Sequence, residues 1–251
     1  MNQIYAVQLE VAGPFAMFAR PDTGGTPTSF PVPTWSASKG IFESIAFLSD
    51  GRAWINPRVV EVCRRIGEPG GRIRFQRYTT NYGGPLRKSS LFGKGTASGG
   101  SSMQLFATIV SDVCYRLQGI VVGTEPSGRT NARHYLKDLF ERRLKQGRCF
   151  RTPCLGWSEF TCSYWGPFRN GVTEVDDALT LDVPSMLVAV WDRPITPPGE
   201  PARYAPRFTQ GQPDSDGNLI ESLKIKHGVL RYDVPSVLPN GPNPQRTSDA
   251  Q

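Results

Sequence analysis

The alternation of apolar and polar positions predicts strands along most of the chain. Residues 3–12, 53–66 and 72–79 alternate in this way, and residues 105–122 form a longer run rich in β-branched side chains. Shorter segments of the same kind follow in the second half of the chain, at 178–183, 186–191, 206–210, 219–226 and 227–232. The pattern therefore predicts long strands in the first half and short ones in the second.

Two segments carry apolar residues at intervals of three and four, which is the spacing of one helix face. The first spans residues 35–48, and Thr34 before it is suited to cap a helix. The second spans residues 131–146, with Thr130 or Asn131 as its cap and Gly147 as a left-handed residue after its end. The apolar positions expected on its buried face are Ala132, Tyr135, Leu136, Leu139, Phe140 and Leu144.

The order of these elements is strand, helix, strand, strand, strand, helix and then short strands. This order predicts an α+β fold, a ferredoxin-like domain of the RNA-recognition type with a small β appendix. We expect the ferredoxin-like domain to span residues 1–165, with an arm at about 77–104. A small β-rich unit is expected at 166–234, and the polar segment 235–251 is expected to be disordered.

The predicted arm differs in composition from the rest of the chain. Residues 80–104 have few apolar side chains and are interrupted by glycine pairs. A loop of this length is uncommon within a compact domain unless it has a function. Its arginines and lysines can meet phosphates, and the aromatic rings in and beside it can stack on bases.

The positive charge of the chain is concentrated in the same region. The net charge is +7, and the segment 52–104 contains ten lysines and arginines but two glutamates, a local net charge of +8. A concentrated patch favours a polyanionic partner, with nucleic acid as the first candidate. An ordinary solvated face is the alternative explanation.

Cysteines, histidines and hydropathy narrow the class of protein. The five cysteines show no CxxC spacing and there are two distant histidines, a pattern that favours reduced thiols and indicates neither a zinc site nor another cofactor. No run approaches the ~20 apolar residues of a membrane span, and the N-terminus does not resemble a secretion signal. We therefore expect a cytoplasmic protein without a membrane partner.

His134 stands out within the second predicted helix. It lies nearly opposite the apolar face, next to charged side chains, so we expect it to face solvent or a ligand. An ordinary surface histidine is the simplest explanation, because histidine titrates near neutrality wherever it is exposed.

Four motifs in order resemble a known family. Residues 18–21 with 32–45, the segment Ser111–Tyr115, Ala132–His134, and 146–160 resemble the subunit of the type I-C (Dvulg subtype) Cascade complex that belongs to the repeat-associated mysterious protein superfamily. The resemblance covers about residues 3–165. It implies antiviral defence, binding of the 5′ handle of CRISPR RNA, and partnership with the backbone and large subunits of Cascade. Target DNA is implied only indirectly, through the complex.

Many members of that family also cut precursor RNA without a metal. The resemblance places the family's Lys-His pair on Arg133 and His134, and its first-helix aromatic on Ala46, whose side chain can neither donate nor accept a proton. Tyr135, Tyr78 and Tyr82 are candidate substitutes for that aromatic. The RNA contacts that we expect are Arg20, Lys39, Arg74, Arg77, Tyr78, Tyr82, Arg87, Lys88 and Lys94.

Three functions remain open on the sequence. The first is a handle-binding subunit that also cleaves precursor RNA. The second is a structural RNA-binding subunit in a system where another nuclease does the processing. The third is a general basic nucleic-acid-binding module outside CRISPR defence.

Overall fold

The computed structural model describes residues 4–82, 103–123, 131–183, 186–189, 207–208 and 223–232. The main sheet contains β1 (Ala6–Ala16), β2 (Ala53–Arg65), β4 (Met103–Gly123), β5 (Tyr164–Gly166) and β11 (Val229–Arg231) in the order β11-β2-β4-β1-β5. All of its strand pairs are antiparallel. The predicted strands at 53–66 and 105–122 are confirmed, whereas β1 lies three to four residues later than predicted.

Two further strands attach beside this order. β3 (Arg74–Tyr82) pairs with the first half of β4, and β6 (Thr173–Val175) pairs with the end of β2. The remaining strands form two small two-stranded sheets. These strands are β7 (Leu181–Val183) with β10 (Leu223–Ile225), and β8 (Leu187–Ala189) with β9 (Arg207–Phe208).

Strands from the second half of the chain thus pair with the main sheet. β6 and β11 both lie within the segment 166–234, and both pair with β2. The boundary predicted at residue 165 stays a prediction. The predicted tail 235–251 and most of the predicted arm lie outside the described residues.

Both helices begin where the sequence predicts. α1 (Trp35–Ile45) starts after Thr34, whose hydroxyl accepts the Ala37 backbone N–H at 3.1 Å. α2 (Ala132–Gln146) starts after Asn131 and ends at Gly147 in the left-handed conformation, φ 64°. α1 ends three residues before the predicted Leu48, because Ala46 is already extended.

One hydrophobic core fills the space between the sheet and the two helices. Leu9 of β1 and Leu117 of β4 are fully buried on this side, together with Phe42 of α1 and Phe140 of α2. The rings of Phe42 and Phe140 lie 5.7 Å apart, so the helices meet on the same face of the sheet. Tyr135 is an exception to the predicted buried face, because it is 55% exposed.

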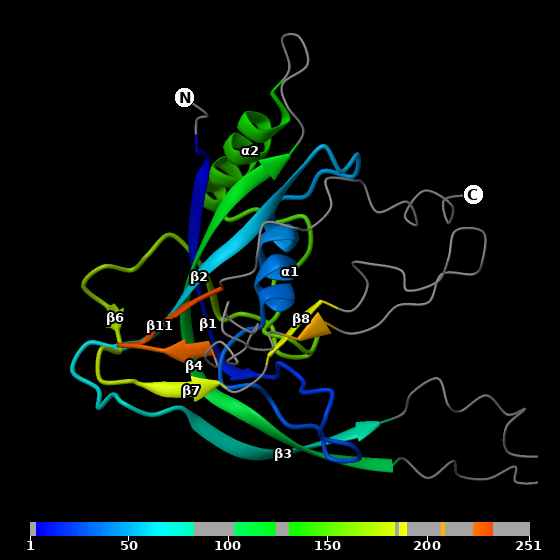
Figure 1. The fold of residues 1–251 in the computed structure, drawn as a ribbon, viewed down its shortest axis with the longest axis vertical. Helices are drawn as coiled ribbons and strands as arrows, with labels where there is room; N and C mark the ends of the chain where they lie inside the picture. The colour runs from blue at the N-terminus through cyan, green and yellow to red at the C-terminus, as the bar shows by residue number, and fades with distance from the viewer. Residues whose placement is uncertain are drawn as a thin grey trace, which may run out of the picture.

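β4 is the central strand and changes partner along one edge. β1 pairs with residues 110–120 along one edge of β4. Along the other edge, β3 pairs with residues 103–111 and β2 pairs with residues 115–123. Asp112 lies between those two stretches and has φ 55°, an unusual value for a residue other than glycine. Figure 1 shows β3 and the start of β4 extending from the lower end of the molecule.

Candidate functional site

The N-terminal end of α2 is held by one side chain. The Asn131 Oδ1 accepts the backbone N–H groups of Arg133 and His134, at 3.1 and 3.2 Å. The Asn131 Nδ2 donates to the hydroxyl of Tyr5 at 3.0 Å. Tyr5 precedes β1 and is 6% exposed, so Asn131 ties the helix end to the first strand.

His134 lies on the solvent side of this helix end. Its side chain is 59% exposed, as the pattern predicted, and its Nε2 lies 3.1 Å from the Asp138 carboxylate one turn further on. The Tyr5 ring packs edge-to-face with the imidazole at a centroid distance of 5.9 Å. Arg133 is half-buried beside it. Consecutive positions at this helix end therefore carry a guanidinium and an imidazole, which are groups that can stabilise a phosphate and move a proton.

The position of the family aromatic lies elsewhere. Ala46 is buried and follows α1. Its neighbour Ile45 offers its carbonyl to the Arg143 guanidinium at 2.7 Å. Arg143 is nine residues beyond His134 on α2, about 13 Å along the helix axis. Position 46 therefore faces the C-terminal half of α2, away from His134.

Tyr78 and Tyr82 are not near His134 either. Both are on β3, where Tyr78 pairs with Ala107 and Tyr82 with Met103. Tyr5, which contacts His134, is bound to Val121 at the far end of β4. Ala107 and Val121 are separated by roughly 45 Å of strand. The interpretation of Tyr78 or Tyr82 as a partner for His134 is therefore wrong, and Tyr5 is the tyrosine that sequence analysis missed.

Tyr78 instead belongs to an aromatic cluster. Its ring lies 5.2 Å from Phe160 and 6.2 Å from Phe15, so the packing fixes its side chain. Burial and the nearby Glu159 carboxylate raise the pKa of the Tyr78 phenol. No signal in the local sequence links positions 15, 78 and 160.

The predicted basic contacts differ in how they are held. Arg20 is paired with Asp22 at 2.7 Å and lies over the Phe30 ring, and Arg74 is paired with Asp112 at 3.1 Å. Lys39 is paired with Glu43 and lies over the Trp54 ring. Arg77 is exposed and has no ion pair among the described residues. Tyr82 ends β3, and Arg87, Lys88 and Lys94 lie outside the described residues.

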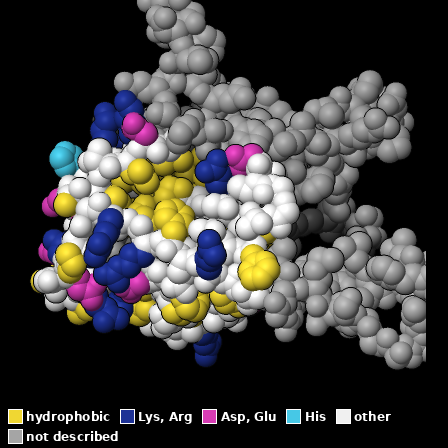
Figure 2. Space-filling model, turned by 90° about the horizontal axis from the view of Figure 1, so that it is seen from below, with side chains coloured by type: hydrophobic (Ala, Val, Ile, Leu, Met, Phe, Trp, Pro, Cys, Tyr) yellow, Lys and Arg dark blue, Asp and Glu magenta, His cyan; other side chains and the backbone are white. Residues whose placement is uncertain are grey.

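Five of the predicted residues thus form two groups, which the fold separates. Arg133 and His134 are on α2, near the top of Figure 1, whereas Arg74, Arg77 and Tyr78 are on β3 at its lower end. Figure 2, which views the lower end, shows basic side chains spaced around an area of apolar ones. A single short ligand does not contact both groups.

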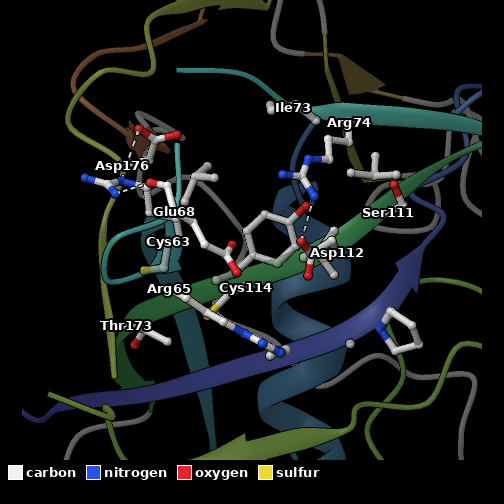
Figure 3. Close-up of a pocket in the computed structure, with 18 of the residues that line it drawn as sticks. Cys63, Arg65, Glu68, Ile73, Arg74, Ser111, Asp112, Cys114, Thr173 and Asp176 are labelled. Atoms are coloured by element: carbon white, nitrogen blue, oxygen red, sulfur yellow. Dashed lines mark hydrogen bonds and ion pairs between the residues drawn. The ribbon is translucent and has the colours of Figure 1, made fainter. Parts of the chain in front are cut away.

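A pocket of about 470 Å³ lies between these groups, where β2 ends and β3 begins. Among the predicted residues that the structure describes, only Arg74 lines it. Figure 3 shows Arg74 directed at Asp112 on one side of the pocket. Cys63 and Cys114, on the neighbouring strands β2 and β4, lie on the other side. The hydrogen bond with Cys114, together with burial, raises the pKa of the Cys63 thiol.

A buried carboxylate stands beside this pocket. Glu10 of β1 is fully buried and accepts hydrogen bonds from the Arg169 backbone and guanidinium, from Arg116 and from Thr173, at 2.6–3.2 Å. Burial alone would raise the pKa of the Glu10 carboxyl, but these donors outweigh it and the pKa is lowered. Arg169 in turn lies over the Tyr164 ring, at 3.9 Å.

Within the described ranges, no group of three or more histidine, cysteine, aspartate or glutamate side chains is arranged to hold a metal ion. None of the helices in the described part of the chain is long and apolar enough to span a membrane. The five cysteines are free thiols.

Comparison with known proteins identifies relatives over most of the chain. The family described as "CRISPR-associated protein (Cas_Cas5)" matches residues 6–227. A protein of Thermus thermophilus named CRISPR pre-crRNA endoribonuclease Cas5d is 30% identical over 181 residues, which are 72% of this chain and 71% of the relative. A protein of the same name from Mannheimia succiniciproducens is 28% identical over 166 residues, covering 63% and 71% of the two chains.

Solved structures show the same fold. A crystal structure of a CRISPR-associated protein aligns with a TM-score of 0.57 at 17% identity, covering 94% of this chain and 97% of that one. The functionally uncharacterized protein SMU1763c of Streptococcus mutans aligns with a TM-score of 0.56 at 16% identity, covering 90% and 91%.

Proposed function

This chain belongs to the Cas5d family of CRISPR-associated proteins, and from that membership we propose that it binds the 5′ handle of CRISPR RNA. It acts as a subunit of a cytoplasmic, type I-C-like Cascade complex in antiviral defence, beside the backbone and large subunits. The observation that carries this proposal is the match of residues 6–227 to the family of CRISPR-associated proteins. The two relatives named pre-crRNA endoribonucleases, aligned over 181 and 166 residues, support it.

The topology supports an RNA-binding domain. The central order β2-β4-β1-β5, with α1 between β1 and β2 and α2 between β4 and β5, is the order of a ferredoxin-like fold. We infer that the domain is of this type, with β3 as the base of an arm inserted between β2 and β4. Sheets of this kind commonly bind single-stranded RNA.

RNA binding is tested by comparing the CRISPR repeat RNA of the same organism with a shuffled RNA of equal length. We expect the repeat RNA to bind at least tenfold more tightly in a filter-binding assay, because handle recognition needs base contacts as well as phosphates. Equal affinity would instead support a general basic nucleic-acid-binding module. Binding of neither RNA would contradict the proposal.

The N-terminal end of α2 favours a second function, which is cleavage of precursor RNA. His134 takes the proton from a 2′-hydroxyl, and the 2′-oxygen forms a bond to the adjacent phosphorus. The bond from phosphorus to the 5′-oxygen breaks, and that oxygen takes a proton from solvent, leaving a 2′,3′-cyclic phosphate. Arg133 stabilises the phosphate charge, and Tyr5 holds the imidazole by edge-to-face packing.

The second histidine provides a matched control for the cleavage reaction. His227 is exposed at φ 49°, a conformation that asparagine tolerates, so His227→Asn removes an imidazole without straining the turn. With labelled repeat RNA in EDTA, we expect His134→Ala to reduce the rate at least 100-fold and His227→Asn to leave it unchanged. If the wild-type protein gives no product, cleavage is contradicted. A purely structural RNA-binding subunit is then the supported function.

A further inference from the structure

The pocket beside β4 lies on the sheet face opposite the helices. Cys114 is in register with Ala12, and Arg116 is in register with Glu10, so these side chains share one face. Tyr115 and Leu117, which alternate with them, are buried in the core that also contains Phe42 of α1 and Phe140 of α2. Ala12, Cys63 and Cys114 therefore form the floor of a pocket of about 470 Å³, a volume that suits a small ligand.

One wall of the pocket is a rigidly held loop. The Asp176 carboxylate, 5% exposed, accepts the Gly71 backbone N–H with both oxygens, at 2.9 and 2.8 Å. Arg64 binds the Glu68 carbonyl and pairs with Glu174 at 2.7 Å. A Cβ at Gly70 would overlap the Asp176 carboxylate, so the close approach requires glycine. The loop 66–73 is thus positioned by contacts with the segment 174–176.

Two arginines beside this loop have guanidinium groups that are not paired with another described residue. Arg65 and Arg72 line the pocket and are exposed, and their guanidinium groups form no ion pair or hydrogen bond among the described residues. By contrast, Arg74 is paired with Asp112, and Arg169 is paired with Glu10. Glu68 is the acidic lining residue whose carboxylate forms no ion pair within the described ranges. The free guanidinium groups therefore outnumber the free carboxylates at the rim.

The pocket also borders the stretch of β4 that lies between its pairings with β3 and β2. Residues 112–114 of β4 are in register with neither β2 nor β3, and all three line the pocket. Asp112 has the unusual φ of 55°, and such outliers cluster at functional sites. Backbone groups on this edge are available to a planar, polar ligand such as a nucleobase.

We propose that this pocket binds one nucleotide, with its phosphate on Arg65 and Arg72 and its base between the floor and the edge of β4. The guanidinium fork suits phosphate, and an unstacked base can lie against apolar and sulfur atoms and hydrogen-bond its edge. The nucleotide is either one residue of a bound RNA or a free mononucleotide. The first case rests on the proposed function.

The alkylation rate of the Cys114 thiol can show directly whether the pocket is occupied. It lies on the floor and is partly exposed, whereas Cys149 is exposed on the loop after α2. The full-length protein is alkylated with N-ethylmaleimide, and each cysteine is followed by peptide mass spectrometry. We expect repeat RNA to slow the alkylation of Cys114 at least fivefold while leaving that of Cys149 unchanged.

The sources of the nucleotide are separated by the added ligand. Protection by repeat RNA but not by millimolar AMP, GMP, CMP or UMP would assign the pocket to an RNA residue. Protection by a mononucleotide as well would assign it to a free nucleotide. Protection by a mononucleotide would support the pocket even if the protein bound no repeat RNA. Failure of the pocket proposal can therefore be told apart from failure of the proposed function. Protection of Cys114 by none of these would overturn the proposal.

Charge substitutions give an independent test that does not depend on thiol reactivity. Arg65→Gln with Arg72→Gln removes both contacts to that one phosphate, so the slope of log K for RNA against log salt is expected to fall by about 0.7. The matched control is Arg148→Gln with Arg151→Gln, which removes two exposed charges on the helix side, next to α1 and α2. Equal effects of the two pairs on affinity, slope and mononucleotide protection would contradict a site in the pocket.

Discussion

Glu10 shows how one buried charge can organise the polar face of the sheet. Its two oxygens accept hydrogen bonds from Arg116 on β4, from Arg169 before β6 and from Thr173 at the start of β6. Removing one partner of a buried pair is costly, because the remaining charges lose their compensation. The carboxylate therefore ties the segment 169–173 to the centre of the sheet, beside the pocket.

We expect Glu10→Gln to lower the free energy of unfolding by about 3 kcal/mol at pH 7. Since the folded state lowers the pKa of Glu10, its contribution is complete above the unfolded pKa near 4.5. It is lost as the pH falls through the lower, folded value. Urea denaturation of both proteins should therefore give a difference that shrinks below pH 4.

Glu141→Gln serves as the control for this change. Glu141 forms a partly exposed pair with Lys137 on α2, and such pairs contribute about 0.5 kcal/mol or less. A loss for Glu10→Gln no larger than that of the control would contradict the role assigned to the buried carboxylate.

The sequence identified exposed residues better than buried polar ones. His134 was predicted to face solvent from its place opposite the apolar stripe, and it does. Glu10 occupies an ordinary polar position of an alternating strand, and its main partner Arg169 is 159 residues away. Tyr5 was missed for the same reason, because its partner Asn131 is distant in sequence. Long-range polar contacts leave no local pattern.

At the scale of elements, α2 depends on a cap with two functions. Asn131 accepts two backbone N–H groups with its oxygen and donates to Tyr5 with its nitrogen. Aspartate is an equally good cap but lacks the donor. Substitutions at this position can therefore separate the stability of the helix from the positioning of His134.

We expect Asn131→Ala to lower the free energy of unfolding by about 1–2 kcal/mol, since both contacts are lost. Asn131→Asp should retain most of the stability. If Tyr5 positions His134, however, Asn131→Asp should still slow RNA cleavage several-fold. Thermal melts measure the stability of each variant, and single-turnover rates measure its cleavage. Equal cleavage rates for wild type and Asn131→Asp would argue against a role of Tyr5 in positioning His134.

The elements themselves were largely predictable, and their limits less so. The helix caps follow from side-chain chemistry, because the structure confirms Thr34 and shows Asn131, one of the two predicted candidates, as the second cap. Tyr135 fits the apolar spacing of α2 but is exposed, because periodicity does not show how wide a face the sheet covers. The unusual conformation of Asp112 has no local sequence signal, since it arises where β2 and β3 succeed each other along β4.

At the scale of the whole molecule, the candidate groups are spread along the length of β4. The α2 end holds His134, the middle holds the pocket, and β3 leads into the basic stretch with Arg87 and Lys88. The sequence shows that these groups exist but not that they are separated. An extended RNA strand fits this arrangement better than a compact ligand does.

Arg87→Ala with Lys88→Ala tests the basic stretch. If both contact phosphates, the affinity for repeat RNA should fall, and the salt slope should decrease by about 1.4. Fluorescence anisotropy at several salt concentrations measures both quantities. If the stretch contributes to binding alone, the cleavage rate at saturating RNA should stay within about twofold. An unchanged slope would show that the stretch does not contact RNA.

The strand order also has a consequence for biosynthesis. β1 and β2 do not pair with each other, and both find their long central partner in β4. During translation β4 emerges last of the three, so the apolar strands of β1 and β2 stay open while about 60 further residues are made. Unpaired apolar strands are prone to aggregate, and such non-local pairing is slow. Slowing the ribosome within residues 66–102 should therefore lower the soluble yield, and extra chaperone should restore it.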